Sequence, residues 1–235
     1  GNISIPNTVA AIEGTFADVD KVVAMDAGTG IATGTLVNRS PHGGTPPDYI
    51  AVAVNITDPV TVAQANKVLV AMTKGVVTAT ISDGDIATLI TTVDNTQTGL
   101  NFTTGGAVAT NGHKLAINLT ESTVTDAQLK ELATRTAGTV TVSSSTTLTG
   151  NFTTPGDLDI VLADTTITGI TNITSTAAAS VDQANNIIGK TSGVVTVTVN
   201  QKGIADLNRL TGSGNALTVT LNTPSVDAAA LNALN

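Results

Sequence analysis

Apolar and polar residues follow two alternating periods along this chain, and together they predict short helices, each followed by a short strand. One block recurs: a hydroxyl residue opens a segment of helical period, a glycine follows, and Val or Ile then alternates with Thr. The copies occupy residues 19–36, 61–81, 125–142, 180–199 and, in part, 225–234. Their aligned glycines are Gly30, Gly75, Gly138 and Gly193. The spacing of these glycines varies from 45 to 63 residues, so the sequence predicts an internal repeat with insertions of unequal length.

Three of the predicted helices begin at a capping box, in which a hydroxyl and an amide side chain reciprocally satisfy free N–H groups. The pairs are Thr61 with Gln64, Thr125 with Gln128, and Ser180 with Gln183. Apolar side chains within these segments recur on one face, which predicts that the helices pack against a sheet. Further short helices are expected at residues 83–90 and 202–210. The aligned glycine is expected to end each helix in the left-handed conformation that favours glycine.

The predicted strands alternate with period two, which assigns Val, Ala, Leu or Ile to one face and Thr to the other. Residues 77–81, 139–142, 195–199 and 217–221 follow this pattern. Strands separated by short helices pair in parallel through right-handed crossovers. A parallel sheet covered on both faces has apolar residues throughout, and this one does not. The sequence therefore predicts an α/β fold: an irregular repeat solenoid with short helices on one face of a largely parallel sheet. Its threonine face is exposed or covered by something else.

Two segments depart from the repeat. Residues 143–176 lack a helical period, so extra β rungs or loops are expected there, with some all-β rungs in the middle of the chain. Residues 38–48 are rich in turn-forming residues and predict a loop. We therefore expect a divergent N-terminal repeat and loop at residues 1–57, then a repeat domain at 58–235 with units near 58–120, 121–176 and 177–235. The repeat domain is expected to form one continuous structural unit.

The composition narrows the class of protein. Of 235 residues, 44 are Thr, only 12% are charged, and the mean hydropathy is +0.26, which excludes a disordered chain. Ten Lys and Arg among eighteen acidic residues argue against a nucleic-acid partner. No apolar run reaches the length of a membrane span, and the absence of Cys excludes a disulfide scaffold. The chain starts without a secretion signal, so a mature protein or a fragment is expected. Abundant Thr, Ala, Val, Asn and Gly with little Lys and Glu is typical of secreted surface proteins of bacteria and archaea.

Candidate catalytic residues are few. His42 and His113 lie among turn formers and are expected to be solvated loop residues, and neither a Cys nor a Gly-x-Ser-x-Gly elbow is present. We therefore predict that the protein is not an enzyme. An enzyme acting on polysaccharide is the third hypothesis, and it needs a carboxylate cluster that the sequence does not identify.

Four aspartates in two close pairs offer oxygen ligands of the kind that calcium prefers. They are Asp83, Asp85, Asp157 and Asp159. No complete calcium-binding loop surrounds them, and Asp83 is equally well placed to cap a helix. Calcium at these residues is the one cofactor that the sequence suggests.

The best-matched segments of the repeat are residues 61–66 with 180–185, together with residues 75–81, 83–89 and 215–221. They resemble tandem repeats in very large, adhesin-like surface proteins of cyanobacteria and other aquatic bacteria. The likeness covers residues 58–95 and 177–235 well and the first 57 residues poorly. It implies an extracellular structural or adhesive role at the cell surface, and it brings no catalytic residues.

Two functions follow from these expectations. The first is a non-catalytic extracellular structural protein: a self-assembling subunit or repeat segment of a surface filament, layer or adhesin, whose partners are copies of itself or neighbouring repeats. A solenoid buries its core only by stacking, and the last repeat stops inside its predicted helix, so exposed ends are expected. Residues 1–6 are expected to add a strand to a neighbour's sheet. The alternative is a monomeric binding module of a larger adhesin, which recognises glycan, calcium or ice through its loops or its threonine face.

Overall fold

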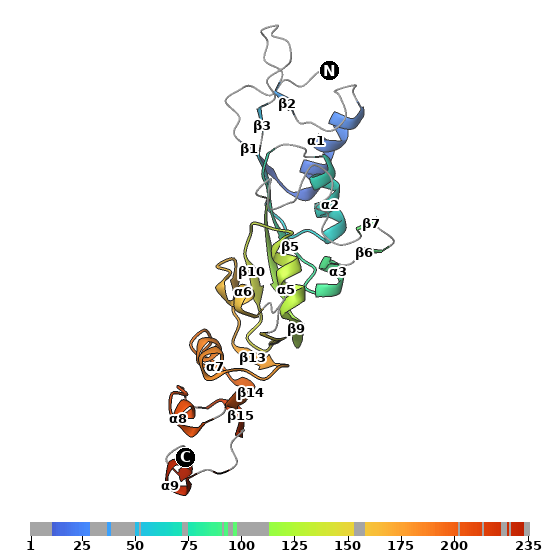
Figure 1. Ribbon diagram of the computed structural model, residues 1–235. Coiled ribbons are helices and arrows are strands. Elements are labelled where there is room, and N and C mark those ends of the chain that lie inside the picture. The colour runs from blue at the N-terminus through green and yellow to red at the C-terminus, as the bar shows by residue number, and fades with distance from the viewer. Residues whose placement is uncertain are drawn as a thin grey trace. The chain divides into compact units, whose positions relative to one another are not determined.

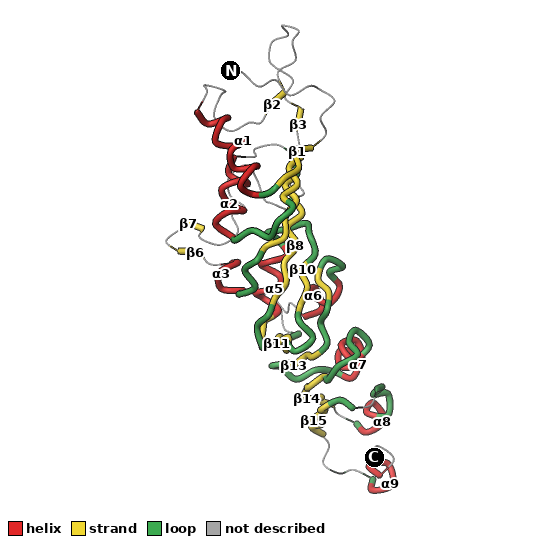
Figure 2. Tube along the Cα trace, turned by 180° about the vertical axis from the view of Figure 1, so that it is seen from behind, coloured by secondary structure: helices red, strands yellow, loops and turns green. Residues whose placement is uncertain are grey.

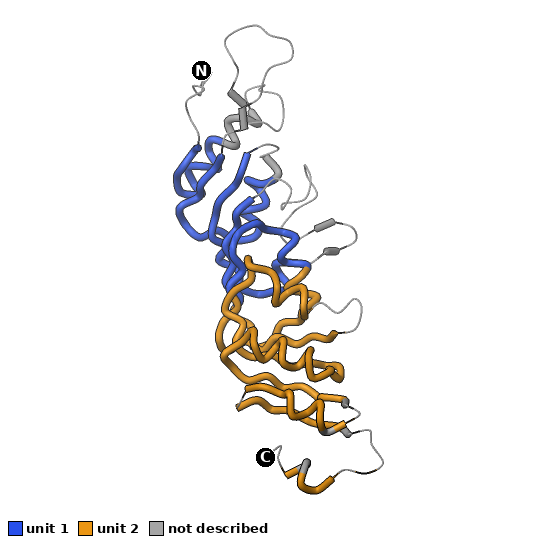
Figure 3. Tube along the Cα trace, turned by 60° about the vertical axis from the view of Figure 1, so that its left-hand side comes forward, with its two compact units in different colours: residues 1–119, 131–141 blue, residues 120–130, 142–235 orange. Residues whose placement is uncertain are grey.

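The computed structural model describes residues 11–28, 37–38, 50–51, 53–71, 75–90, 92–93, 96–97, 113–152, 158–201, 203–212, 214–221, 225 and 227–232. The chain divides into two compact units: residues 1–119 with 131–141, and residues 120–130 with 142–235 (Figure 3). The division passes through one helix and one strand, because the chain leaves the first unit at residue 119, returns at 131 and leaves again after 141.

The first unit contains a parallel sheet whose strands follow chain order, β1-β4-β5-β8-β10 (Figure 1). These strands are β1 (Ala11–Gly14), β4 (Ala53–Ile56), β5 (Val77–Ile81), β8 (Lys114–Leu119) and β10 (Val140–Val142). Along one side of them lie the helices α1 (Phe16–Gly28), α2 (Val62–Ala71) and α3 (Ile86–Ile90) (Figure 2). Two short antiparallel pairs are β2 (Val37–Asn38) with β3 (Ile50–Ala51), and β6 (Thr92–Val93) with β7 (Thr96–Gln97).

The second unit contains another parallel sheet in chain order, here written from its last strand as β15-β14-β13-β11-β9. Its strands are β9 (Thr123–Thr125), β11 (Thr147–Gly150), β13 (Asn172–Ser175), β14 (Val195–Gln201) and β15 (Ala216–Leu221). The short β12 (Ile167–Thr168) lies between β11 and β13 in sequence but is not a strand of this sheet. The helices are α5 (Asp126–Ala133), whose last turn belongs to the first unit, α6 (Leu158–Ala163), α7 (Val181–Ile188), α8 (Ile204–Leu207) and α9 (Ala228–Asn232).

Aliphatic side chains form the core, and they fall where the two periods predict. In the second unit Leu148 pairs with Ile173 and Ile173 with Val195, and all three side chains are fully buried. Helix α7 contributes its own buried face of Val181, Ala184 and Ile187. Each large aliphatic side chain buried in this way contributes about 1.5–3 kcal/mol, so these residues stabilise the fold although aromatic residues are few.

The predicted α/β class is confirmed at the level of two parallel sheets and short helices. The three capping boxes are also confirmed. The backbone N–H groups of Thr61, Thr125 and Ser180 each donate to the glutamine side chain three residues on, at 2.9 Å. The N–H of each glutamine donates back to the hydroxyl oxygen at 3.2 or 3.3 Å. Among the described helices, none combines the length and the apolar character that a membrane crossing requires.

Two predictions about helices are wrong. Residues 143–176 contain strands, as predicted, but they also contain helix α6, which buries Leu158 and Val161 where only β rungs or loops were expected. A helix of six residues has too few apolar positions to produce a visible period. The last predicted helix begins later than residue 225: Asp227 Oδ1 accepts a hydrogen bond from the N–H of Ala229 at 2.9 Å, and α9 starts at Ala228.

Glycine is required at the aligned positions for different physical reasons in different copies of the repeat. Gly75 has a φ of 93°, which is the left-handed conformation predicted for it. Gly138 and Gly193 lack this conformation and follow the ends of α5 and α7 by several residues, so the prediction is wrong there. A Cβ on Gly138 would overlap the carbonyl group of Leu115, and one on Gly193 would overlap that of Thr171. Close approach of two backbone segments therefore requires glycine at these positions.

Candidate functional site

The outer face of the first unit's sheet, opposite the core, carries the polar residues that the alternation predicts. On β5, Val77, Ala79 and Ile81 are buried, whereas Thr78 and Thr80 are exposed. We call this surface the threonine face. The described helices α1, α2 and α3 lie on the opposite side of the strands (Figure 2), and Thr78 and Thr80 are exposed, so these hydroxyl groups are accessible for hydrogen bonding.

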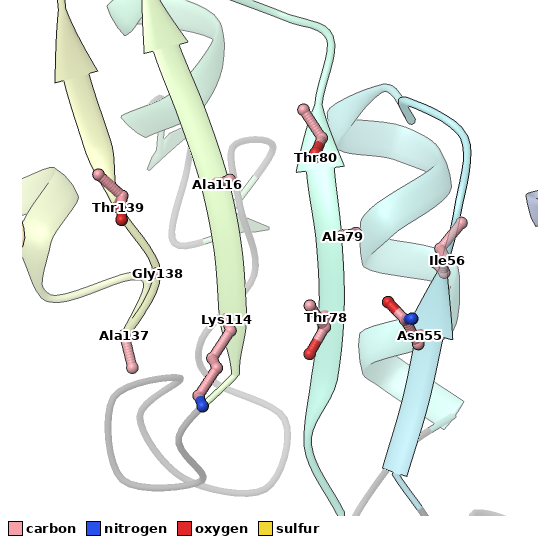
Figure 4. Close-up of a pocket in the computed structure, with 10 residues that line it drawn as sticks. All are labelled: Asn55, Ile56, Thr78, Ala79, Thr80, Lys114, Ala116, Ala137, Gly138 and Thr139. Atoms are coloured by element: carbon pink, nitrogen blue, oxygen red, sulfur yellow. The ribbon is translucent and has the colours of Figure 1, made fainter. Parts of the chain in front are cut away.

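One row of the threonine face crosses three neighbouring strands. Thr78 pairs with Asn55 on β4 and with Lys114 on β8 (Figure 4). Adjacent strands are about 4.8 Å apart, so an amide, a hydroxyl and an ammonium group stand side by side. The row lies in a shallow hollow of about 450 Å³. Its other lining residues are Ile56, Ala79, Thr80, Ala116, Ala137, Gly138 and Thr139.

Lys114 is the one charged side chain among the described residues that line this hollow. It is exposed, as are Thr78 and Thr80, while Asn55 is half-buried. The hollow therefore offers hydrogen-bond donors and acceptors and a single positive charge. It is suited to a polar or anionic ligand and not to a cation.

A longer threonine row crosses the second unit. Thr149 pairs with Thr125 and Thr174, and Thr174 pairs with Thr196, so four neighbouring strands carry threonine at the same level. Thr125 and Thr196 are exposed, and the two between them are half-buried. The row presents hydroxyl groups and no titratable group, so it can form hydrogen bonds but supplies no acid or base.

His113 is a buried residue of the first unit, and the prediction that it is a solvated loop residue is wrong. It is only 3% exposed and stands directly before β8. Its Nδ1 accepts a hydrogen bond from the N–H of Val77, the first residue of β5, at 2.9 Å. In the second unit Asn215 has the same role, since its Oδ1 accepts from the N–H of Val195, the first residue of β14, at 3.0 Å. Each side chain thus satisfies the first N–H of the neighbouring strand.

Burial lowers the pKa of His113 below its usual value of 6.5. Its Nδ1 accepts a hydrogen bond only in the neutral imidazole, so protonation would remove that bond and leave a charge in the core. The unfolded chain therefore binds the proton more readily than the folded chain does. The contribution of His113 to stability is complete above pH 6.5 and is lost as the pH falls from 6.5 through the lower folded-state pKa.

We expect this loss to appear in thermal denaturation of the unmodified protein between about pH 8 and about pH 5. A His113→Asn variant is expected to lose less stability over the same range, because an amide oxygen can accept from Val77 as that of Asn215 accepts from Val195. The difference between the two proteins removes the contributions of other titrating groups. Equal losses in both would contradict the role assigned to His113.

Asp83 and Asp85 act as helix caps in the first unit. Asp83 Oδ2 accepts from the N–H of Val62, the first residue of α2, at 2.6 Å. Asp85 Oδ1 accepts from the N–H of Ala87, and its Oδ2 accepts from the hydroxyl of Thr88, both at 3.0 Å. Within the described residues, no group of three or more His, Cys, Asp or Glu side chains is placed to hold a metal ion. Calcium at this pair stays a prediction.

The second aspartate pair is only partly described. Asp159 is exposed on α6, and its Oδ1 accepts from Asn186 Nδ2 on α7 at 2.9 Å. Asp157 lies outside the described residues, as do His42, Gly30 and residues 39–48 of the predicted loop. Calcium at Asp157 and Asp159 therefore also stays a prediction.

The cap that Asp83 provides has a counterpart one strand earlier. Asp58 Oδ1 accepts from the N–H of Phe16, the first residue of α1, at 2.6 Å. Each carboxylate lies two residues after a strand of the sheet: Asp58 after β4, and Asp83 after β5. An acidic cap at a helix N-terminus contributes about 0.5–2 kcal/mol, so these aspartates have a structural role whether or not a cation binds.

The sheet of the second unit ends in a strand, β15, whose apolar side is only partly covered. Val199 on β14 is fully buried, whereas its partner on β15, Val219, is 41% exposed. Leu217, which pairs with the buried Val197, is half-buried. In the strand order of the described residues β15 has one neighbour, β14. A strand of this kind presents free backbone groups and apolar surface to a further strand.

The sequence does not reveal the hollow around Lys114, because the Asn-Gly-His-Lys segment at residues 111–114 is typical of a turn. The signal that could have revealed β8 is the alternation of Leu115, Ile117 and Leu119, all of which are buried.

Comparison of the chain with protein-family models, with curated proteins and with solved structures gives no significant match. The geometry of the two units is therefore the basis for a functional assignment.

Proposed function

We propose that this chain is a non-catalytic extracellular structural protein: a self-assembling subunit, or a repeat segment, of a cell-surface filament, layer or adhesin. The observation that carries the proposal is the edge of β15, where Val219 is 41% exposed beside the fully buried Val199. The composition supports a surface location, because the chain is rich in Thr and only 12% of its residues are charged. The resemblance of its repeats to those of adhesin-like surface proteins supports it as well.

The proposal includes an irregular repeat solenoid as the architecture, with short helices on one face. Recurring local geometry supports it. Thr136 Oγ1 accepts from the N–H of Gly138 at 2.8 Å, and Thr191 Oγ1 accepts from that of Gly193 at 3.1 Å. Each hydroxyl also donates to a carbonyl of the segment against which its glycine packs. Stacked repeats contact only their neighbours, so an end strand of such an array leaves its core open unless another strand covers it.

Self-assembly can be tested through the edge itself. We expect light scattering of the purified chain to show association that increases with concentration. A Val219→Lys variant is expected to weaken that association about tenfold or more, because a lysine at a sheet edge opposes pairing. Circular dichroism would show that the variant is folded, since the side chain is already 41% exposed.

Ile160→Lys on α6 provides the matched control. Ile160 is 52% exposed, so it is as accessible as Val219, but it lies on a helix and not on the strand edge. Its substitution is expected to leave association unchanged. Equal weakening by both substitutions would indicate non-specific apolar contacts, and a monomer at every concentration would overturn the proposed function.

The alternative function, a monomeric binding module, is favoured by one observation: the hollow on the threonine face of the first unit. Its ammonium group on Lys114, with the amide of Asn55 and the hydroxyl of Thr78, suits an acidic saccharide better than calcium. A concentration-independent monomer that binds acidic glycans on an array, and loses that binding on Lys114→Ala, would replace assembly as the assignment.

A further inference from the structure

We infer that β15 of one copy pairs in parallel with β1 of the next copy, so that the chains join head to tail. The inference rests on the proposed self-assembly and adds to it the identity of the partner surface. Such a contact uses two different surfaces of the same chain, so it leaves one of each unused at the ends. It therefore continues into an open filament when the rotation between copies does not close a ring.

The first step of the argument is that β15 lacks the features that protect sheet edges. Residues Ala216–Leu221 contain no charge and no proline. All six residues pair with β14 in an unbroken register, so the backbone is held in the extended conformation that a further strand needs. Natural edges are usually short, charged, bulged or interrupted by proline. β15 is thus a template for another strand.

The second step is that β1 has the matching pattern. It stands at the other end of a strand order, and its neighbour there is β4. Ile12 pairs with the buried Val54 on the core side but is itself only half-buried, and Glu13 pairs with Asn55 on the outer face. Beside β15, an Ile12 placed opposite Val219 would cover the exposed flank of that valine.

The third step concerns direction and handedness. Both sheets are parallel and both follow chain order, so the last strand of one and the first strand of another can pair in parallel. Right-handed crossovers, which are nearly universal in such sheets, put the helices on the same face of each. The second copy's α1 begins at Phe16, two residues after β1 ends, and would continue the helical layer beyond β15. This continuity favours a second copy as the occupant of the edge.

The chain contains no cysteine, so any disulfide that forms must join cysteines introduced by substitution. With Ile12 opposite Val219, Glu13 lies opposite Thr220 on the outer face. Neighbouring residues on parallel strands have Cα atoms about 5 Å apart, within the range of a disulfide. We expect a mixture of Glu13→Cys and Thr220→Cys chains to give the mixed disulfide dimer on mild oxidation, identified by intact mass. Each variant alone is expected to give at least about tenfold less dimer, because its single thiol meets no thiol in a head-to-tail contact.

Two controls define the contact. Lys190→Cys, at an exposed position away from both edges, is expected to give no mixed dimer with Glu13→Cys. Thr218→Cys, two residues along β15 on the same face, is expected to react less than Thr220→Cys. If the unmodified protein associates but the Glu13 and Thr220 variants give no mixed dimer, or only dimers of one variant, the head-to-tail contact is wrong and the proposed function stands. If the unmodified protein does not associate, both are wrong.

Discussion

Replacing Gly193 with alanine is expected to lower the free energy of unfolding of the second unit by about 3 kcal/mol or more. The added Cβ would overlap the carbonyl oxygen of Thr171 and lie 2.6 Å from its carbonyl carbon and 2.9 Å from Asn172 Oδ1. Backbone atoms cannot rotate away as a long side chain can, so the two segments must separate. Separation also breaks the hydrogen bond from the N–H of Val194 to Asn172 Oδ1, which is 3.2 Å long.

Gly203→Ala is the matched control for this substitution. A Cβ on Gly203 meets no atom within 4 Å, and its φ lies outside the left-handed region. Alanine there is expected to be neutral or to stabilise by about 0.5 kcal/mol, because it reduces the freedom of the unfolded chain. Urea unfolding followed by circular dichroism measures both variants. Similar midpoints for the two would show that the close approach at Gly193 does not limit stability.

Gly193 also illustrates how far sequence reasoning reaches in this protein. The repeat correctly identified it as a special position, because a residue without a side chain recurs at the same place in each copy. The physical reason could not be read in the same way. Gly75 needs a positive φ, while Gly193 needs room for a neighbouring backbone, and only the three-dimensional packing distinguishes the two. The sequence repeat therefore identifies these positions as requiring glycine, and the structure gives the physical reason at each of them.

The sequence predicts helices and strands correctly where the periodic pattern of apolar residues extends over enough positions. The helices α2, α5 and α7 have eight or more residues and a capping box, and all three were anticipated. Helix α6 was missed because it has six residues. Strand β8 is not predicted because the Asn-Gly-His-Lys sequence at residues 111–114, which ends on its first residue, is typical of a turn, although the alternation of the strand is regular. The turn-forming residues therefore concealed a strand that the alternation of apolar residues in β8 indicates correctly.

Of the candidate site, the sequence predicts only that one face of the sheet is rich in threonine. Alternation alone predicts a threonine face, but the hollow depends on the register that sets Asn55, Thr78 and Lys114 side by side. Register between strands that are distant in sequence is set by packing and by loop lengths, which the irregular repeat does not encode visibly. The buried position of His113 has the same origin, since its partner, Val77, lies 36 residues earlier.

The second large effect is expected at Arg135, a buried cation whose side chain is 1% exposed. Its Nη1 and Nη2 donate to the carbonyl oxygens of Leu89 and Ile90 at 3.3 and 3.0 Å, at the C-terminal end of α3. Nη2 and Nε also donate to Glu131 Oε1, at 2.8 and 3.1 Å. The guanidinium thus satisfies two carbonyl groups that the end of a helix leaves free, and its charge opposes the negative end of the helix dipole.

Arg135→Met is expected to lower the free energy of unfolding of the first unit by about 3 kcal/mol, because similar volume is kept while two carbonyl groups lose their donor. Arg135→Lys is expected to restore only part of this loss, since one ammonium cannot reproduce the planar fork that reaches both carbonyls and a carboxylate. Hydrogen exchange at the amides of residues 86–90 should accelerate in the methionine variant, which places the effect at α3.

Arg209 supplies the comparison that decides the cause. It also pairs with a carboxylate, Asp182, but the two side chains are 58% and 73% exposed. Pairs of this kind contribute about 0–1 kcal/mol, since water competes for both charges, so Arg209→Ala is expected to cost at most about that. A loss at Arg135 no larger than the loss at Arg209 would mean that the ion pair alone matters. A much larger loss shows that the buried carbonyl groups of α3 depend on the guanidinium, and that α3 is held by hydrogen bonds from a residue 45 positions later in the chain.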